Sequence, residues 1–254
     1  MDPKSTDDSG WSKVPELTLL FWIIKIAATT LGETGGDAVS MSMGLGYLAG
    51  TAIFMAVFIA AVLIQIKAER FHPVTYWFTI IATTTVGTTM ADYADRSLGI
   101  GYAGGSALLL TLLLASLSVW YRTMGTIAVD SVNSPKTEMF YWVTIMFSQT
   151  LGTALGDWTA DTEGFGYVKG AILFGTLLAV VAALYFRTQT SRTFLFWSAF
   201  ILTRPLGAVL GDFMDKPIAN GGLALSRYSA TGALVAFILL CVLSFPHRAA
   251  SKAH

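Results

Sequence analysis

Cysteine, histidine and charge are all scarce in this 254-residue sequence. The single cysteine, Cys241, lies in the last apolar run, which excludes a disulfide framework and a thiolate metal cluster. The three histidines fall in polar connections or in the C-terminal tail, so no imidazole is expected inside a membrane site. Charged residues make up 13% of the chain, against about 25% in soluble domains. The net charge is zero, which gives no basic field for nucleic acid.

A cleavable signal peptide is also not expected, because no basic segment precedes a short apolar core. Residues 1–16 are polar and acidic, and we expect them to form a solvated cytoplasmic tail. Residues 246–254 form a second such tail, which leaves 17–245 as a single membrane domain.

Apolar runs near the length that spans a bilayer, about 20 residues, recur through this domain. They predict helices at 17–36, 46–66, 74–92, 101–121, 139–157, 166–186, 194–212 and 227–245. Eight such runs joined by short connections favour an all-α polytopic membrane protein with eight transmembrane helices.

The eight runs form four repeats, at 17–67, 73–122, 138–187 and 193–245. Each repeat opens near a tryptophan, and these tryptophans are Trp22, Trp77, Trp142 and Trp197. The even runs of the first three repeats begin with Gly-apolar-Gly-Tyr, as at 44–47. Two helices per unit make all four units parallel, which predicts a pseudosymmetry axis along the membrane normal.

Orientation follows from the basic residues of the connections. The side that holds both termini carries ten Lys and Arg residues, and the other side carries four. Both termini are therefore expected in the cytoplasm, with the tryptophans at the cytoplasmic interface. An aspartate lies fifteen positions after each tryptophan, about 22 Å along a helix, which places it in the outer half of the membrane.

These aspartates are the strongest functional signal, because ionisable groups inside a membrane segment are costly and usually mark a site. The four are Asp37, Asp92, Asp157 and Asp212. A second acid lies three or four positions away in each repeat, on the same helix face: Glu33, Asp95, Asp161 and Asp215. Like charges at this spacing repel unless they share a cation or a proton. The alternative is a set of helix-end charges solvated by the outer aqueous phase.

Small residues precede every aspartate by one and by five positions, and such pairs let membrane helices pack closely. The glycines in this pattern are Gly32, Gly36, Gly87, Gly152, Gly156, Gly207 and Gly211. Threonines line the preceding turns, either donating to the carboxylates or bonding back to their own helix. We expect the glycine pairs to bring the aspartates toward a common axis.

Two basic residues lie inside the predicted helices. Lys25 is one turn past Trp22 and is favoured to extend to the cytoplasmic interface, with a role as counter-charge as the alternative. Arg204 lies deeper and precedes Pro205, which is expected to kink the helix. Arg204 is predicted to pair with the acids as a fixed counter-charge or a gate.

The repeated unit Trp…Gly-x-x-x-small-Asp…Gly-aromatic-Gly-Tyr resembles a bacterial family of membrane-anchored proteins built from a four-fold tandem repeat of unknown function. The resemblance covers roughly 17–245. It implies eight helices in a bacterial cytoplasmic membrane and brings no activity with it. The fourth repeat departs from the pattern at Arg204-Pro205 and at its Gly-Tyr segment, so its role is expected to differ.

We therefore predict a transporter of a small cation and not an enzyme. The ligand oxygens suit Mg²⁺, Ca²⁺, Mn²⁺, Na⁺ or a proton. The nearby thioethers of Met41, Met43, Met90 and Met214 favour Mn²⁺ as the first candidate. The metal is the substrate, bound by the four aspartates and exchanged for protons as in an antiporter; no covalent cofactor is expected. The alternatives are a cation channel with the same acidic ring, a membrane enzyme and a scaffold.

Overall fold

A computed structural model of the chain describes residues 12–161 and 165–250, and this part is built from eight long α-helices. They are α1 (Leu19–Asp37), α2 (Gly46–Lys67), α3 (Pro73–Asp92), α4 (Gly101–Met124), α5 (Pro135–Asp161), α6 (Gly166–Arg187), α7 (Arg192–Asp215) and α8 (Arg227–Ser244). Short π-helical turns, η2 (Ala38–Ser42) and η3 (Tyr93–Ser97), follow α1 and α3; 3-10 turns η4 (Val129–Ser131) and η5 (Ile218–Asn220) lie in connections. The all-helical class and the helix order are as predicted.

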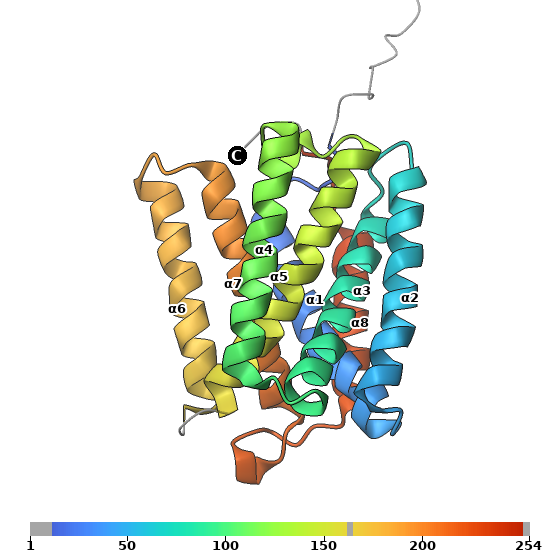
Figure 1. Ribbon diagram of the computed structural model, residues 1–254, viewed down its shortest axis with the longest axis vertical. Helices are drawn as coiled ribbons and strands as arrows, with labels where there is room; N and C mark the ends of the chain where they lie inside the picture. The colour runs from blue at the N-terminus through green and yellow to red at the C-terminus, as the bar shows by residue number, and fades with distance from the viewer. Residues whose placement is uncertain (1–11, 162–164, 251–254) are drawn as a thin grey trace, which may run out of the picture.

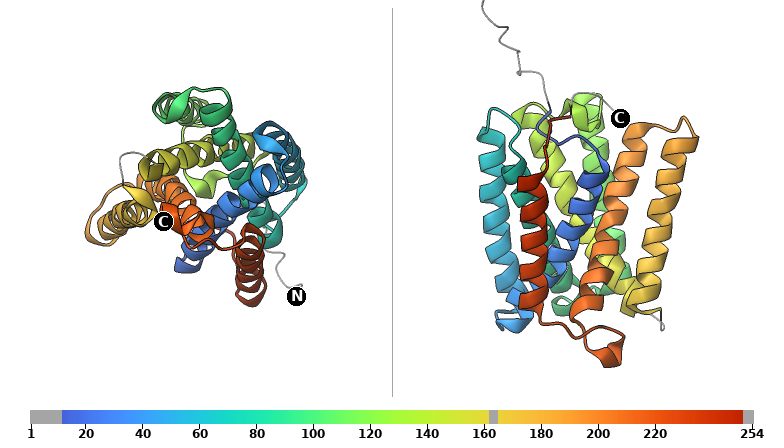
Figure 2. Two further views of the ribbon diagram at one scale, coloured as in Figure 1. Left: turned by 90° about the horizontal axis from the view of Figure 1, so that it is seen from below. Right: turned by 180° about the vertical axis from the view of Figure 1, so that it is seen from behind.

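The odd helices form an inner bundle and the even helices lie around it (Figures 1 and 2). In the bundle α1 packs against α3 and α7, and α5 packs against the same two helices. Outside it α2 packs on α3, α4 on α5, α6 on α7 and α8 on α1. The main partner of each even helix is therefore the odd helix of the following repeat, and α8 returns to the first.

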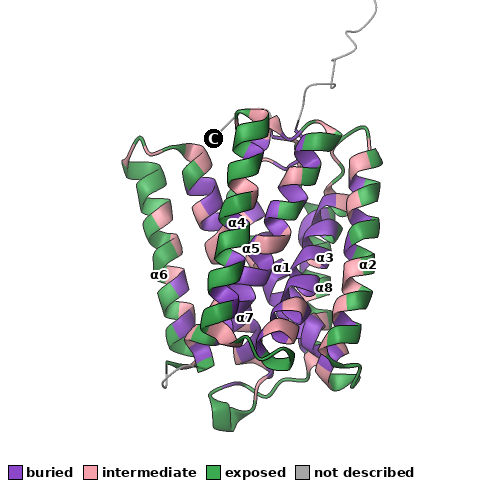
Figure 3. Ribbon diagram, viewed as in Figure 1, coloured by how far each residue is buried: buried purple, intermediate pink, exposed green. Residues whose placement is uncertain are grey.

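Burial separates these two layers (Figure 3). In the part of the chain that the structure describes, five helices are long and apolar enough to cross a membrane, namely α2, α4, α6, α7 and α8, which indicates a multi-pass membrane protein in contact with lipid. In the outer four, at most 28% of the apolar window is buried, against 67% in α7. The remaining helices, α1, α3 and α5, are less apolar because they carry the buried hydroxyls and acids of the bundle.

Glycine allows the inner helices to approach closely. A Cβ at Gly32 would lie 2.9 Å from the backbone carbon of Thr84, and one at Gly87 would lie 3.0 Å from that of Gln149. A Cβ at Gly152 would overlap the stem of Arg204, and one at Gly207 would lie 2.8 Å from the backbone carbon of Thr29. The second small residues behave likewise, since Gly36 faces Thr88, Gly156 faces Ala208 and Gly211 faces Glu33. All seven glycines thus lie where a neighbouring helix leaves little or no room for a Cβ.

The backbone conformation explains the two glycines of the Gly-apolar-Gly-Tyr segment. Gly44 and Gly46 have φ values of +69° and +77°, a left-handed conformation that residues with a Cβ rarely adopt. The two glycines turn the chain at the end of η2 and start α2. Gly164, the first glycine of the third segment, lies outside the described residues.

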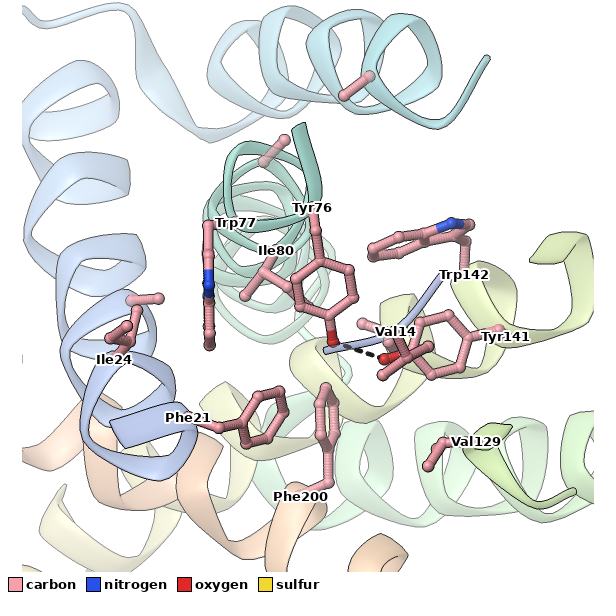
Figure 4. Close-up of a cluster of buried hydrophobic side chains, with 14 of the residues drawn as sticks. Val14, Phe21, Ile24, Tyr76, Trp77, Ile80, Val129, Tyr141, Trp142 and Phe200 are labelled. Atoms are coloured by element: carbon pink, nitrogen blue, oxygen red, sulfur yellow. Dashed lines mark hydrogen bonds between the residues drawn. The ribbon is translucent and has the colours of Figure 1, made fainter. Parts of the chain in front are cut away.

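Both termini lie at one end of the bundle, where aromatic side chains fill the space between the inner helices (Figures 2 and 4). Trp77 and Trp142 are almost fully buried there, and the hydroxyls of Tyr76 and Tyr141 are 2.7 Å apart. Trp197 is 4% exposed. The prediction placed the repeat tryptophans by depth, at the cytoplasmic interface, and this depth stays a prediction. These three are buried because the odd helices that carry them are interior.

Residues 12–15 are also buried, contrary to the expectation of a fully solvated N-terminal tail. The Nζ of Lys13 is 2.7 Å from Oε1 of Glu138 on α5, and Val14 belongs to the aromatic core cluster. The backbone amide of Ala250 donates to the carbonyl of Val14, which joins the two ends of the chain. Together these segments cover the aromatic end of the bundle.

Candidate functional site

Arg204 lies at the centre of the inner bundle with no exposed surface. One terminal nitrogen donates to Oε2 of Glu33 at 2.9 Å and to Oγ1 of Thr88 at 2.6 Å, and it also contacts Oγ1 of Thr153. These partners come from α1, α3 and α5, so the guanidinium of α7 ties all four inner helices together. The predicted pairing of Arg204 with the acids is present, with Glu33 as its carboxylate. The helix α7 continues through Pro205 without interruption.

Beyond Arg204, away from the termini, the four aspartates divide into two pairs. The first pair joins α3 to α5. Arg96, in the π-helical turn after α3, places Nε 3.0 Å from Oδ1 of Asp92 and a terminal nitrogen 3.1 Å from Oδ2 of Asp157. Both carboxylates are at most 3% exposed, whereas the arginine side chain is 32% exposed. One guanidinium therefore bridges the two carboxylates through two separate nitrogens and offsets one of their two negative charges.

The second pair joins α7 to α1. The Nζ of Lys216, the residue at which the chain leaves α7, is 3.0 Å from Oδ1 of Asp212 and 2.7 Å from Oδ2 of Asp37. Arg227, at the start of α8, places Nε 2.7 Å from Asp215 and 3.7 Å from Asp37. The Lys216 side chain is only 14% exposed. In both pairs the base lies four residues after one aspartate and reaches the aspartate of the next inner helix.

Both bridging bases are held in their charged forms. Burial lowers the pKa of Lys216, but Asp212 and Asp37 oppose this more strongly, and the net pKa lies above its usual value. Burial likewise lowers the pKa of Arg96, but the attraction of Asp92 and Asp157 raises it more strongly. The net pKa of Arg96 therefore lies above its usual value. Each pair thus contains a permanent positive charge at neutral pH.

Three carboxylates are close enough to hold one metal ion. Glu33, Asp37 and Asp212 are buried, and one oxygen of each lies within 4.8 Å of the others. Among the described residues Oδ1 of Asp37 has no hydrogen-bond partner. This group combines two of the four predicted aspartates with Glu33, also a predicted cation-binding residue, and lies at the α7–α1 pair. Its all-oxygen donors fit a hard cation such as Mg²⁺ or Mn²⁺.

The remaining predicted acids lie around this centre. Asp215 pairs with Arg227 as described, while Asp161 is exposed at the end of α5 and accepts from the Tyr102 hydroxyl at 2.7 Å. Asp95 packs against Gly105 of α4, and burial raises its pKa against the opposing effect of Arg96. Eight carboxylates with the four bases that contact them, Arg96, Arg204, Lys216 and Arg227, leave four surplus negative charges when all are ionised.

Lys25 differs from its prediction. Its side chain is fully buried and does not extend to the interface. The Nζ is 3.4 Å from Oγ1 of Thr203 and 4.1 Å from the centre of the Phe200 ring. The helix is interior at this point, so the side chain has no route to water. Lys25 therefore lies between the aromatic end and Arg204, away from the carboxylates.

The threonines mostly bond back to their own helices, as at Thr30, Thr85 and Thr150. Thr88 and Thr153 also bond back to their own helices, and in addition their hydroxyls accept from Arg204. Both lie eleven positions after their tryptophan, as Glu33 does, so aligning the repeats would have singled them out. Arg96 and Lys216 were missed for another reason: they were counted as connection charges, although each follows an aspartate by four residues, a spacing that favours ion pairs.

The helical fold, the apolar outer layer and the buried charges define a multi-pass membrane protein with a polar centre in an inner four-helix bundle. The chain belongs to the family described as Repeat of Unknown Function (DUF347), whose model matches four times, at 20–71, 75–126, 140–191 and 195–248. This confirms the predicted four-fold tandem repeat. Among curated proteins and among solved structures, none matches the chain.

Proposed function

We propose that the protein is a transporter of a small cation, with Mn²⁺ as the first candidate and protons as the exchanged species. In this proposal all eight helices cross a bacterial cytoplasmic membrane, related by a pseudosymmetry axis along its normal, with both termini in the cytoplasm. The less apolar helices α1, α3 and α5 can cross because the outer helices shield them from lipid.

The observation that carries the proposal is the group of Glu33, Asp37 and Asp212. Three buried carboxylates within 4.8 Å of one another are costly unless positive charge is shared between them. Asp37 keeps one buried oxygen without a hydrogen-bond partner among the described residues. The surplus of acids over bases leaves room for a divalent ion or for protons. These are the properties expected of a site that binds cations and protons in turn.

The two ends of the bundle support a transporter over an open pore. The buried rings of Tyr76, Trp77 and Trp142 close the end that holds the termini, as Figure 4 shows. At the opposite end the bases beside the acids are partly exposed, Arg96 by 32% and Arg227 by 22%. A cation would therefore enter from the side opposite the termini. Release at the other side would require the aromatic end to open, which is alternating access.

Transport by purified protein in liposomes tests the proposal. We expect saturable Mn²⁺ uptake that depends on a pH gradient, and we expect Asp37→Asn or Asp212→Asn to abolish it. Asp130→Asn is the matched control, because Asp130 lies in η4 at the end that holds the termini. Uptake that is unchanged in Asp37→Asn would overturn the site. Fast, unsaturable flux without proton coupling would instead support the alternative of a cation channel.

A further inference from the structure

Lys216 occupies part of the proposed cation site. Its ammonium contacts two of the three carboxylates that could hold a metal, Asp37 at 2.7 Å and Asp212 at 3.0 Å. The third, Glu33, is bound by Arg204 at 2.9 Å. A metal ion drawn to the same oxygens would meet a positive charge only a few ångströms away. The cation and the Lys216 ammonium therefore cannot both make their closest contacts with Asp37 and Asp212.

The attachment of Lys216 suits a side chain that leaves and returns. Its backbone is extended (φ −74°, ψ 155°), so α7 ends there. The backbone itself is fixed, because the Lys216 amide donates to the carbonyl of Asp212 and its own carbonyl accepts from the amide of Ala224, both at 2.9 Å. The lysine stem is a flexible chain ending in a single charged nitrogen. Movement of the ammonium therefore needs rotation of the side chain and no refolding of the loop.

The equivalent base in the other pair is built differently. Arg96 binds Asp92 and Asp157 through two different nitrogens of one rigid plane. Such a fork is harder to displace than an ammonium, because both contacts break together. The structure thus places an exchangeable base beside the metal-capable group and a fixed base beside the other pair.

We propose that Lys216 is a tethered competitor of the transported cation, which holds Asp37 and Asp212 when the site is free and leaves when the cation binds. This inference rests on the proposed function and adds a specificity element to it. The bound ammonium keeps buried carboxylates from facing one another without a positive charge. Only an ion that attracts the oxygens more strongly than an ammonium does can displace it, which favours divalent over monovalent ions.

Calorimetric titration of purified protein with MnCl₂ tests this competition. Removal of the competitor in Lys216→Gln is expected to tighten Mn²⁺ binding about tenfold, equivalent to about 1.4 kcal/mol. Lys216→Arg, a stronger bidentate competitor, is expected to weaken it. The matched control is Lys169→Gln, since Lys169 is an exposed lysine near the same end, on α6. A purely structural lysine predicts unchanged or weaker binding in Lys216→Gln.

A second variant covers the case in which Lys216→Gln folds poorly. Lys216→Cys in a Cys241→Ala background carries one cysteine, which 2-bromoethylamine converts to a lysine analogue. Binding of MnCl₂ is expected to be tight before this modification and to return to the wild-type strength after it. If the wild type binds Mn²⁺ and neither neutral variant binds more tightly, the competition is wrong and the proposed function stands. If no form binds Mn²⁺, the proposed function and this inference both fail.

Discussion

The two aspartate pairs both bury two carboxylates close together, and the positive charges that compensate them differ. Between α3 and α5, the single guanidinium of Arg96 bridges Asp92 and Asp157. Between α7 and α1, Lys216 bridges Asp212 and Asp37, while further charges gather around them from Glu33, Arg204 and Arg227. The repeats supply aspartates at equivalent positions, yet within the described ranges only the second pair belongs to a group of three acids that could hold a metal.

The comparison indicates that the two aspartate pairs have different roles within the repeated fold. A rigid guanidinium that fills the first pair leaves little reason for a cation to enter there. The second pair has a third acid beside it and a monodentate ammonium. Buried oxygens without a hydrogen-bond partner among the described residues occur in both pairs, on Asp37 and on Asp92 and Asp157, and so do not distinguish them. The first pair therefore stabilises the packing of α3 against α5, and the second carries the proposed chemistry.

Loss of Arg204 is expected to have the largest effect, since it leaves Glu33 buried without its partner. Breaking a buried ion pair from one side costs about 3–5 kcal/mol, so Arg204→Met should lower the free energy of unfolding by that amount. Thermal unfolding in detergent measures it. The exposed Arg187→Met is the matched control, and Glu33→Gln added to Arg204→Met should restore part of the loss. An equal cost for Arg204→Met and Arg187→Met would contradict a central role for this pair.

The two bridging bases should differ in their contribution to stability. Arg96→Gln removes the base that joins Asp92 to Asp157, and with hydrogen bonds to charged groups worth about 1.5–3 kcal/mol we expect a loss near 3 kcal/mol. Lys216→Gln should cost only about 1 kcal/mol, because Arg227 remains 3.7 Å from Asp37 to share the neutralisation. Chemical unfolding of both variants in one detergent decides the order. The reverse order would remove the distinction between a fixed and an exchangeable base.

Much of this arrangement followed from the sequence, because it repeats. Apolar length and the glycine turns located the helices, and four of them, α2, α4, α6 and α8, begin at the predicted residue. The small residues before each aspartate lie at close contacts between the inner helices. The burial of Glu33 and Arg204 followed from their depth between apolar residues.

Pairing across repeats could not be read in the same way. The choice of α3 rather than α1 as the partner of α2 depends on packing between repeats, which no single repeat encodes. For the same reason the sequence indicated a depth for Trp77 and Trp142 but not their burial between the inner helices. Bridges such as that from Arg96 to Asp157 join residues 61 positions apart. In each bridge, only the contact between the base and the aspartate four residues before it could be predicted from the sequence.

Glycine substitutions probe whether the α7–α1 and α3–α5 helix interfaces are equally tightly packed. A Cβ at Gly207 would lie 2.8 Å from the Thr29 backbone, whereas one at Gly87 would lie 3.0 Å from that of Gln149. Overpacking costs about 1–3 kcal/mol, and we expect Gly207→Ala to lie at the upper end and Gly87→Ala at the lower. Gly175→Ala, on α6 with open space at its Cβ, should be neutral or stabilising. Thermal unfolding of the three variants gives the order, and equal costs at Gly207 and Gly87 would show that the interfaces do not differ.

The smallest effect on stability is expected for the hydrogen bond between Tyr102 and Asp161, which lies beside the first pair and is partly exposed to solvent. The Tyr102 hydroxyl donates to Oδ2 of Asp161 at 2.7 Å, and that carboxylate is 41% exposed. Water can replace most of this hydrogen bond, so Tyr102→Phe should cost only about 0.5 kcal/mol. Tyr121→Phe, an exposed tyrosine of the same helix, is the control. A double-mutant cycle with Asp161→Asn isolates the pair energy. A coupling energy as large as the effect of Arg96→Gln would mean that Asp161 belongs to the first pair as a third buried charge. The two aspartate pairs would then each contain three acids and would resemble one another more closely than the contact distances indicate.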